Sequence, residues 1–172
     1  MTGYEIPRPR RGPDNNQLVP RGGAARARNR WRGEATGYFD GRPEQVARIR
    51  AWCRRATGFD EDRAAPVVLV ASELVTNAVR HTASGGRCGR VRITLEVMPG
   101  DFVLMRVTDD GPRAGRPSTY PGVPDCSEEL NAEGYGLTLV TALSKKWWWT
   151  NHPDGPLTVW AFIDPQRDLD EA

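Results

Sequence analysis

The sequence has few of the features that mark secreted, membrane-spanning or zinc-binding proteins. Its three cysteines, Cys53, Cys88 and Cys126, are odd in number and widely spaced, and they include no C-x-x-C pair. This excludes a disulfide framework and disfavours a structural zinc site. No apolar run approaches the roughly 20 residues that a membrane-spanning helix needs, and no apolar core follows the N-terminal arginines as in a secretory signal. We therefore expect a cytoplasmic protein.

The charge of the chain is unevenly distributed along its 172 residues, although the formal net charge is only +2. Residues 1–32 contain eight arginines and two acidic residues and have almost nothing to bury, which predicts a disordered basic tail of charge +6. The rest of the chain carries 16 basic and 20 acidic groups. We expect one domain over 33–165 and a short tail over 166–172. No recognition helix accompanies the basic tail, so nucleic-acid binding is not expected.

The hydrophobic pattern beyond residue 40 predicts an α+β domain. Apolar residues recur every three to four positions in some segments and alternate with polar residues in others. We expect a two-layer α/β sandwich, in which a mixed and mostly antiparallel sheet carries helices on one face. The loop over 112–133 is long enough to indicate a functional lid. The predicted helices are 43–57, 60–81 and 137–144, and the predicted strands are 91–97, 102–108, 147–150 and 157–163, with a further strand expected before the first helix.

The second predicted helix carries three polar side chains one turn apart. Glu73, Asn77 and His81 are spaced by four residues and therefore lie on one stripe. An asparagine carbonyl can bind an octahedral Mg²⁺ that keeps several waters, and a glutamate can orient or deprotonate an attacking hydroxyl. The stripe favours chemistry on a magnesium nucleotide. The alternative is a solvated polar face on an otherwise buried helix.

Two glycine motifs follow along the chain. Asp109 and Gly111 end a predicted strand, where a carboxylate can accept a hydrogen bond from an exocyclic amine and glycine lets a ring approach the backbone. An ordinary Asp-Gly turn is the alternative. Gly134 and Gly136 lead from the long loop into a helix that begins near Leu137, where backbone N–H groups suit phosphate oxygens. The Rossmann and P-loop patterns are both absent.

The order of these motifs resembles a known ATP-binding fold. It resembles the domain shared by gyrase, MutL, histidine kinases and anti-sigma-factor kinases, which is called the Bergerat fold. That domain combines a Glu-x-x-x-Asn helix, a strand ending in Asp-x-Gly, a long loop, and Gly-x-Gly at the start of a helix. The resemblance covers about 35–163, and the string SELVTNAVRH is its most specific part. The short single-domain form looks most like the anti-sigma regulatory serine kinases. Histidine kinases would need a helical hairpin with a phosphoacceptor histidine, and gyrase and MutL relatives a transducer domain.

The resemblance implies roles for individual residues of this chain. It implies that Glu73 is the general base, that Asn77 is the Mg²⁺ ligand, and that Asp109 accepts a hydrogen bond from adenine with Gly111 beside the ring. The further nucleotide-contacting positions that it implies are Gly134, Gly136, Leu137, Thr158 and, unless it closes the helix instead, His81.

The chain departs from the family pattern at two positions. Relatives often have an arginine where this chain has Tyr135, and a Trp-Gly pair where it has Trp147 and Trp148. In a strand Trp148 points away from Trp147 and Trp149. We expect two core tryptophans and a partly exposed Trp148, or else a Trp148 that marks a homodimer or partner contact.

The resemblance also implies a function. The chain would be a serine/threonine protein kinase that uses ATP and Mg²⁺, phosphorylates an anti-anti-sigma partner and holds a sigma factor. The alternative is a non-catalytic binding module in which ATP orders the 112–133 loop and so exposes or hides a partner surface.

Overall fold

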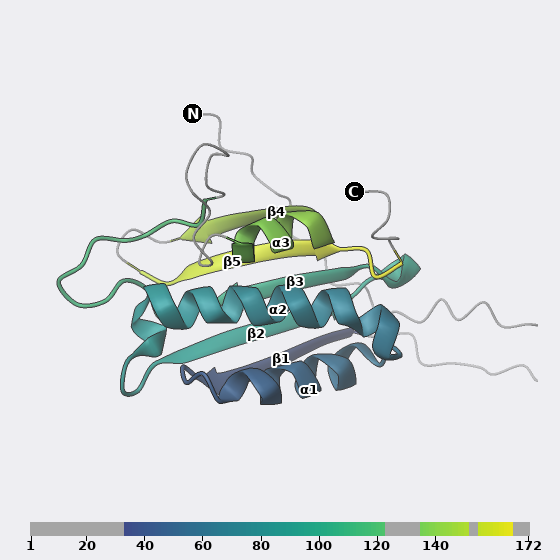
Figure 1. The fold of residues 1–172 in the computed structure, drawn as a ribbon, viewed down its shortest axis with the longest axis horizontal. Helices are drawn as coiled ribbons and strands as arrows, with labels where there is room; N and C mark the ends of the chain where they lie inside the picture. The colour runs from purple at the N-terminus through teal and green to yellow at the C-terminus, as the bar shows by residue number, and fades with distance from the viewer. Residues whose placement is uncertain (1–32, 123–134, 152–154, 167–172) are drawn as a thin grey trace, which may run out of the picture.

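The computed structural model describes residues 33–122, 135–151 and 155–166, which form a five-stranded sheet with helices on one face (Figure 1). The strand order is β1-β2-β3-β5-β4. The predicted α+β class is confirmed, and the described strand pairs are all antiparallel rather than mixed. The strands are β1 (Gly33–Asp40), β2 (Arg90–Val97), β3 (Val103–Thr108), β4 (Ser144–Asn151) and β5 (Leu157–Ile163). The α-helices are α1 (Gln45–Thr57), α2 (Glu61–His81) and α3 (Tyr135–Leu143), with 3-10 turns at Ala83–Gly85 and Pro99–Asp101.

Local sequence signals set the ends of the two long helices. Helix α1 ends at Gly58, whose φ of 63° is a left-handed conformation that glycine adopts without a steric penalty. Helix α2 follows Asp60, whose side chain accepts a hydrogen bond from the Arg63 backbone N–H at 3.0 Å. The first helix was predicted to start at Pro43, whereas α1 begins two residues later, at Gln45.

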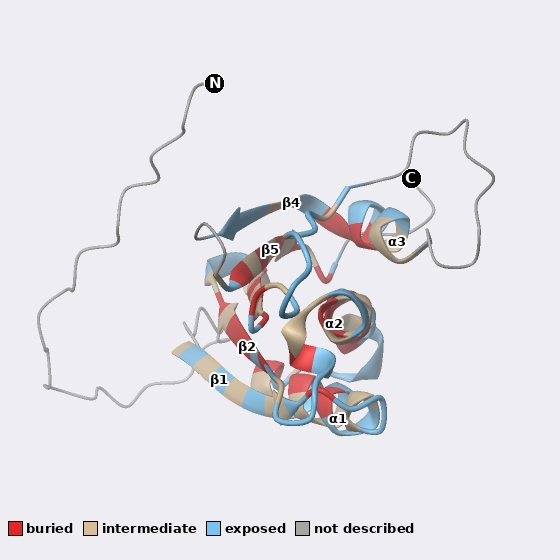
Figure 2. Ribbon diagram, turned by 90° about the vertical axis from the view of Figure 1, so that its left-hand side faces the viewer, coloured by how far each residue is buried: buried red, intermediate tan, exposed pale blue. Residues whose placement is uncertain are grey.

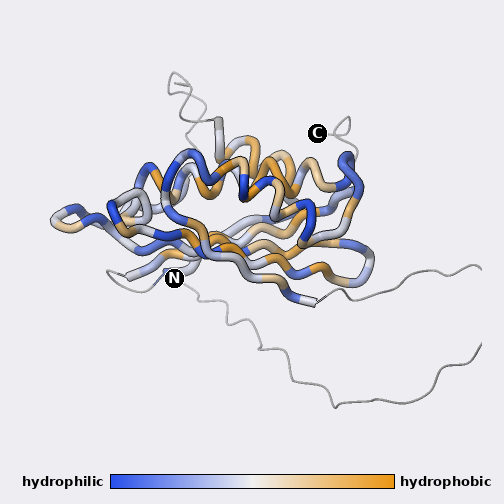
Figure 3. Tube along the Cα trace, turned by 90° about the horizontal axis from the view of Figure 1, so that it is seen from below, coloured by the Kyte–Doolittle hydropathy of each residue, from blue (hydrophilic) through white to orange (hydrophobic). Residues whose placement is uncertain are grey.

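The hydrophobic core lies between the sheet and the helices (Figure 2). Alternate residues of β3 and β5 are buried, so one face of each strand packs toward α2. Apolar stretches concentrate in the two layers and hydrophilic stretches in the connecting segments (Figure 3). The buried residues on these strands are Val103, Met105, Val107, Leu157, Val159, Ala161 and Ile163, and those on α2 include Val67, Val70, Ala71, Leu74, Val75 and Ala78.

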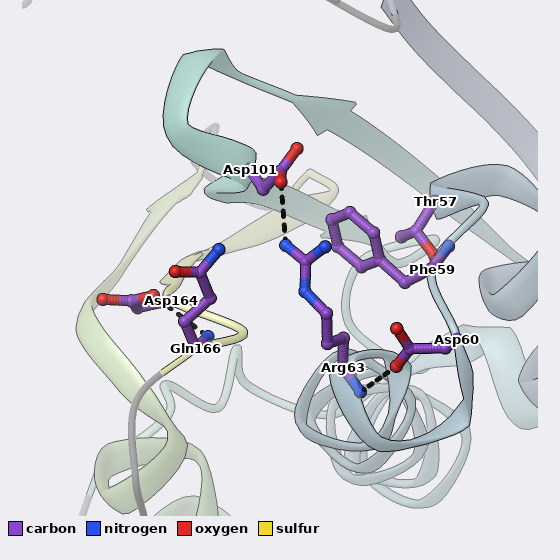
Figure 4. A network of polar contacts seen from close by, with 7 residues as sticks. All are labelled: Thr57, Phe59, Asp60, Arg63, Asp101, Asp164 and Gln166. Carbon is purple, nitrogen blue, oxygen red and sulfur yellow. Dashed lines mark hydrogen bonds and ion pairs between the residues drawn. The ribbon is translucent and has the colours of Figure 1, made fainter. Parts of the chain in front are cut away.

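The N-terminal end of α2 is attached to the turn between β2 and β3 (Figure 4). The Arg63 guanidinium pairs with Asp101 at 2.9 Å and lies 4.6 Å from the centre of the Phe59 ring. Both charged side chains are about one-third exposed, so the pair contributes modestly to stability. The pair links the start of α2 to the β2–β3 turn at one end of the sheet.

The C-terminal end of α2 is capped by Arg113, which lies beyond the end of β3. Its guanidinium donates to the carbonyl oxygens of Thr82 at 3.0 Å, Val79 at 3.3 Å and Arg80 at 2.6 Å. The last carbonyls of a helix have no intrahelical partner and carry its negative dipole end, so a cation there is stabilising. Arg113 thereby links the segment after β3 to the end of α2 that carries His81.

Replacing Arg113 by alanine should loosen this end of the helix. We expect Arg113→Ala to lower the free energy of unfolding by about 1 kcal/mol, or roughly 3 °C in Tm, because exposed hydrogen bonds from a charged donor are lost. Arg116→Ala is the matched control, since Arg116 is exposed in the same segment and its side chain has no hydrogen bond or ion pair to a described residue. Equal melting temperatures for the two variants would contradict the capping role.

The three consecutive tryptophans of β4 have different surroundings. Trp147 packs against the core and donates its indole N–H to the Thr141 hydroxyl of α3 at 2.8 Å. Trp148 is half-buried and stacks on Trp160 with ring centres 5.8 Å apart. Trp149 is 37% exposed. The prediction of a second core tryptophan is therefore wrong for Trp149, because it lies on the edge strand β4 and stacks on the exposed ring of Tyr120.

The described part of the chain bears on the expectations about membrane-spanning helices and disulfides. No helix there is long and apolar enough to cross a membrane. Cys53 and Cys88 are free thiols, the first buried and the second exposed, and Cys126 lies outside the described residues. Burial raises the pKa of Cys53 to about 12, so this thiol stays protonated at neutral pH.

Candidate nucleotide-binding site

A cavity of about 240 Å³ lies between α2, the ends of β3 and β5, and residues 119–122. Its lining is mostly apolar, with a few polar groups among the apolar side chains, as is common in small-molecule sites. The apolar side chains are Leu74, Ala78, Val107, Leu137, Leu157 and Val159, and the polar ones include Asn77, His81, Thr82, Asp109 and Thr119.

The buried carboxylate in this cavity is Asp109, which directly follows β3 and is 7% exposed. Its Oδ1 accepts hydrogen bonds from the backbone N–H of Gly111 at 2.7 Å and of Leu157 at 3.0 Å. The Asp109 N–H in turn donates to the Leu157 carbonyl at 3.0 Å. No group within the described residues donates a hydrogen bond to Oδ2. One carboxylate oxygen is thus fixed by the backbone, and the other can accept from a ligand.

The Asp109 charge is poorly solvated. Burial raises the pKa of its carboxyl above the ordinary value, and the Asp110 carboxylate acts in the same direction, whereas the N–H groups of Leu157 and Gly111 act against it. Folding therefore favours the protonated form, and the resulting stability is lost as the pH rises through the raised pKa. An ionised carboxylate in this position gains more from a ligand's amine than an exposed carboxylate would.

Gly111 permits this arrangement. It has a φ of 84°, and a Cβ atom there would lie 2.9 Å from the carbonyl carbon and oxygen of Gly155. The position therefore requires glycine, so that the chain after Asp109 can approach the start of β5 closely. The Gly111 N–H holds the Asp109 carboxylate by a hydrogen bond, and Gly111 also lines a small hollow next to the main cavity.

The helix motif and the second glycine motif meet at the other end of the site. A Cβ atom on Gly136, in the first turn of α3, would lie 2.7 Å from Glu73 Oε2 and 3.9 Å from Asn77 Nδ2. Glycine at this position lets the start of α3 pack against the polar stripe of α2. The first backbone N–H groups of a helix lack intrahelical acceptors and carry its positive dipole end, so anionic oxygens bind favourably there.

The structure brings most of the sequence-predicted residues together. Asn77, His81, Asp109 and Leu137 line the cavity, and Glu73, Gly111 and Gly136 adjoin it. Gly134 lies outside the described residues.

Thr158 is not brought to the cavity. Its hydroxyl is 2.9 Å from the Thr108 hydroxyl, on the sheet face opposite the helices, and its neighbours Leu157 and Val159 line the cavity instead. Because successive strand residues point to opposite faces, an offset of one residue moves a side chain to the other side of the sheet.

Sequence reasoning missed the outer wall of the cavity, formed by residues 119–122. The nearest sequence signal for this wall was the length of the 112–133 loop, which predicted a functional segment. The apolar lining from Val107 follows from the alternation along β3 and could have been derived from it.

The side-chain oxygens of Glu73 and Asn77 are compatible with a metal ion that binds together with a nucleotide. No group of three or more His, Cys, Asp or Glu that could hold a metal occurs among the described residues. A resident cation would need such a cluster, whereas Mg²⁺ on nucleotide phosphates keeps waters and needs one or two protein oxygens. The Asn77 carboxamide, which lines the cavity one turn from Glu73, fits that requirement.

Comparison with known proteins identifies the family. The model of the histidine kinase-like ATPase domain matches residues 39–160, which include α2, Asp109, α3 and most of β5. The chain therefore belongs to this family, and its cavity lies in an ATP-binding domain. A solved structure, the histidine kinase domain of the Erythrobacter litoralis EL346 blue-light activated histidine kinase, is similar at 22% identity with a TM-score of 0.42. The match covers 74% of this chain and 63% of that chain, less than two thirds of its length. No curated protein sequence matches.

Proposed function

We propose that the chain is a serine/threonine protein kinase of the anti-sigma type. It would transfer the γ-phosphoryl group of ATP to an anti-anti-sigma partner and also bind a sigma factor. The observation that supports this best is the close approach of Gly136 to Glu73, which leaves no room for a side chain at residue 136 and puts a carboxylate beside the N-terminal turn of α3. A carboxylate close to a phosphate-binding helix end is suited to accept a proton from an attacking hydroxyl.

The residues divide into a base end and a phosphate end. At the base end Asp109 Oδ2 accepts from the exocyclic amine of adenine, and the apolar lining covers the ring. At the phosphate end the first N–H groups of α3 bind phosphate oxygens, and the Asn77 carbonyl would hold Mg²⁺. When bound, Mg²⁺ neutralises phosphate charge.

The transfer step follows from this placement. The bond from the γ-phosphorus to the β–γ bridging oxygen breaks, and a bond to the serine or threonine Oγ of the partner forms. Glu73 takes the hydroxyl proton, and ADP leaves. Catalysis then depends on positioning and electrostatic stabilisation, as in other phosphoryl transfers.

Label transfer tests the proposal. The protein is incubated with ATP labelled at the γ-phosphate and with a co-encoded anti-anti-sigma candidate, and a partner variant with its acceptor serine changed to alanine serves as the control. We expect label on the partner, and none on the variant. If neither carries label while ATP remains bound, protein kinase activity toward that partner is excluded.

A second function is favoured by the outer wall of the cavity. Residues 119–122 contribute to the site and lie at the surface of the molecule, so a bound nucleotide can alter the surface offered to a partner. In this nucleotide-gated module, the affinity for a sigma factor or a second copy of the chain differs between ATP and ADP. No phosphate is transferred or released.

A further inference from the structure

We infer that Tyr120 is a nucleotide-contacting residue that forms the aromatic outer wall of the base pocket, with Trp149 as its support. The inference rests on the nucleotide site proposed above and adds a residue that the sequence motifs do not indicate. Tyr120 lines the cavity together with Asp109, and it also lines the small neighbouring hollow with Gly111 and Asn151. It therefore lies at the end of the site where the base is expected.

The Tyr120 ring is held by the edge strand β4. It stacks on Trp149 with ring centres 4.8 Å apart and planes inclined by 25°. Asn151, two residues further along β4, donates to the Tyr120 hydroxyl at 3.4 Å. One face of the tyrosine ring is thus occupied by Trp149, so the part that borders the cavity is its other face or its edge.

This aromatic pair is unusually open to solvent. Tyr120 is 54% exposed and Trp149 is 37% exposed, and both are among the exposed large hydrophobic residues of the described chain. The Tyr120 ring, which lines the apolar cavity, leaves apolar surface in water that a planar ligand would cover. A purine base provides a flat π surface of this kind.

The backbone around Tyr120 is restrained on both sides. Pro121 follows directly and restricts the Tyr120 backbone to extended conformations. Earlier in the same segment, Arg113 is tied to the end of α2 by its three hydrogen bonds. The segment that carries Tyr120 is therefore attached to α2 at one end and to β4 at the other.

The two contacts with the base have different chemistry. Asp109 accepts a hydrogen bond and so distinguishes bases with an exocyclic amine, whereas an aromatic ring packs against any base. Tyr120 should therefore contribute affinity for the base whatever phosphates are attached. An equal loss of affinity for ligands with and without phosphates therefore distinguishes a contact with the base from a purely structural role of Tyr120.

Calorimetric titration of the full chain with ATP, ADP and adenosine tests the inference. We expect Tyr120→Ala to lower the affinity for each of the three ligands by a similar factor, about tenfold, as for loss of one aromatic contact with a base. Tyr120→Phe should bind as the wild type does, because the ring and not the hydroxyl makes the contact. Trp149→Ala should show a smaller loss. Tyr38→Ala is the matched control, since Tyr38 is 66% exposed on β1 at the opposite edge of the sheet.

The outcomes separate this inference from the nucleotide site itself. If Tyr120→Ala binds all three ligands as the wild type does while Asp109→Asn does not, the Tyr120 contact is wrong and the site stands. A loss for ATP with none for adenosine also overturns the contact with the base. If the wild type binds none of the three ligands, the nucleotide site and the inference fail together.

Discussion

Asp109→Asn is expected to lower the affinity for ATP by about a hundredfold or more, because it removes a hydrogen bond to a buried charged acceptor and leaves two donors facing each other. The asparagine Oδ1 can still accept from the N–H groups of Gly111 and Leu157, so the local backbone should be retained. Its amide NH₂ then replaces Oδ2 and faces the exocyclic amine of adenine. Calorimetric titration with ATP at neutral pH measures the loss.

The same variant should be at least as stable as the wild type when no nucleotide is present. Burial raises the pKa of the Asp109 carboxyl because desolvation penalises its ionised form in the unliganded protein, and the neutral amide of the variant carries no such penalty. This advantage of the variant should shrink as the pH is lowered and Asp109 takes up its proton. Melting curves over a pH series check both statements.

Asp110→Asn is the control for this experiment. Asp110 is exposed and accepts from the Arg90 N–H at 2.6 Å, a bond that asparagine can also accept. Its ATP affinity should stay within about twofold of the wild type, because an exposed carboxylate outside the cavity has little differential interaction with the base. Equal losses in the two variants would mean that overall negative charge, and not the Asp109 acceptor, governs binding.

Glu73→Gln is expected to separate chemistry from binding. Removing a general base lowers rates by about 10²- to 10⁴-fold, and we expect the rate of phosphoryl transfer to the partner to fall within that range. The glutamine has nearly the same shape as glutamate and can keep the close packing against Gly136. ATP affinity should be unchanged or higher, since a negative charge near the phosphates is removed. Single-turnover transfer and calorimetry measure the two quantities.

Glu61→Gln provides the comparison on the same helix. Glu61 lies in the first turn of α2 and is exposed, far along the helix from Glu73. Transfer should be unaffected in this variant. Transfer by Glu73→Gln at the wild-type rate would show that Glu73 is not the base, although the nucleotide site would remain.

The sequence predicted the elements with strong periodicity well and their junctions less well. The alternation over 91–97 and the helical spacing over 60–81 correspond closely to β2 and α2. The strand predicted from Trp147 begins earlier, at Ser144, because β4 follows α3 with no intervening turn. The Lys145 and Lys146 pair resembles a loop in sequence, yet it lies on an edge strand, where charged residues are common.

The inner part of the site could be predicted and the outer part could not. Spacing by four residues places Glu73, Asn77 and His81 on one stripe, and the resemblance assigned Asp109 and Gly136 to the same nucleotide. The placement of Thr158 was less secure, because the apolar residues of β5 occupy both faces and alternation cannot identify the inner one.

The contact of Tyr120 with Trp149 joins segments that are 29 positions apart in the sequence. Such a contact depends on the folded arrangement of the sheet edge and leaves no local pattern. This is why the outer wall of the cavity emerged only from the structure.

The most direct test of the nucleotide site is a crystal structure with Mg²⁺ and a non-hydrolysable ATP analogue. We expect the exocyclic amine of adenine within hydrogen-bond distance of Asp109 Oδ2, and the phosphates at the first turn of α3, beside Glu73 and Gly136. A base bound elsewhere on the molecule, or phosphates away from α3, would contradict this assignment.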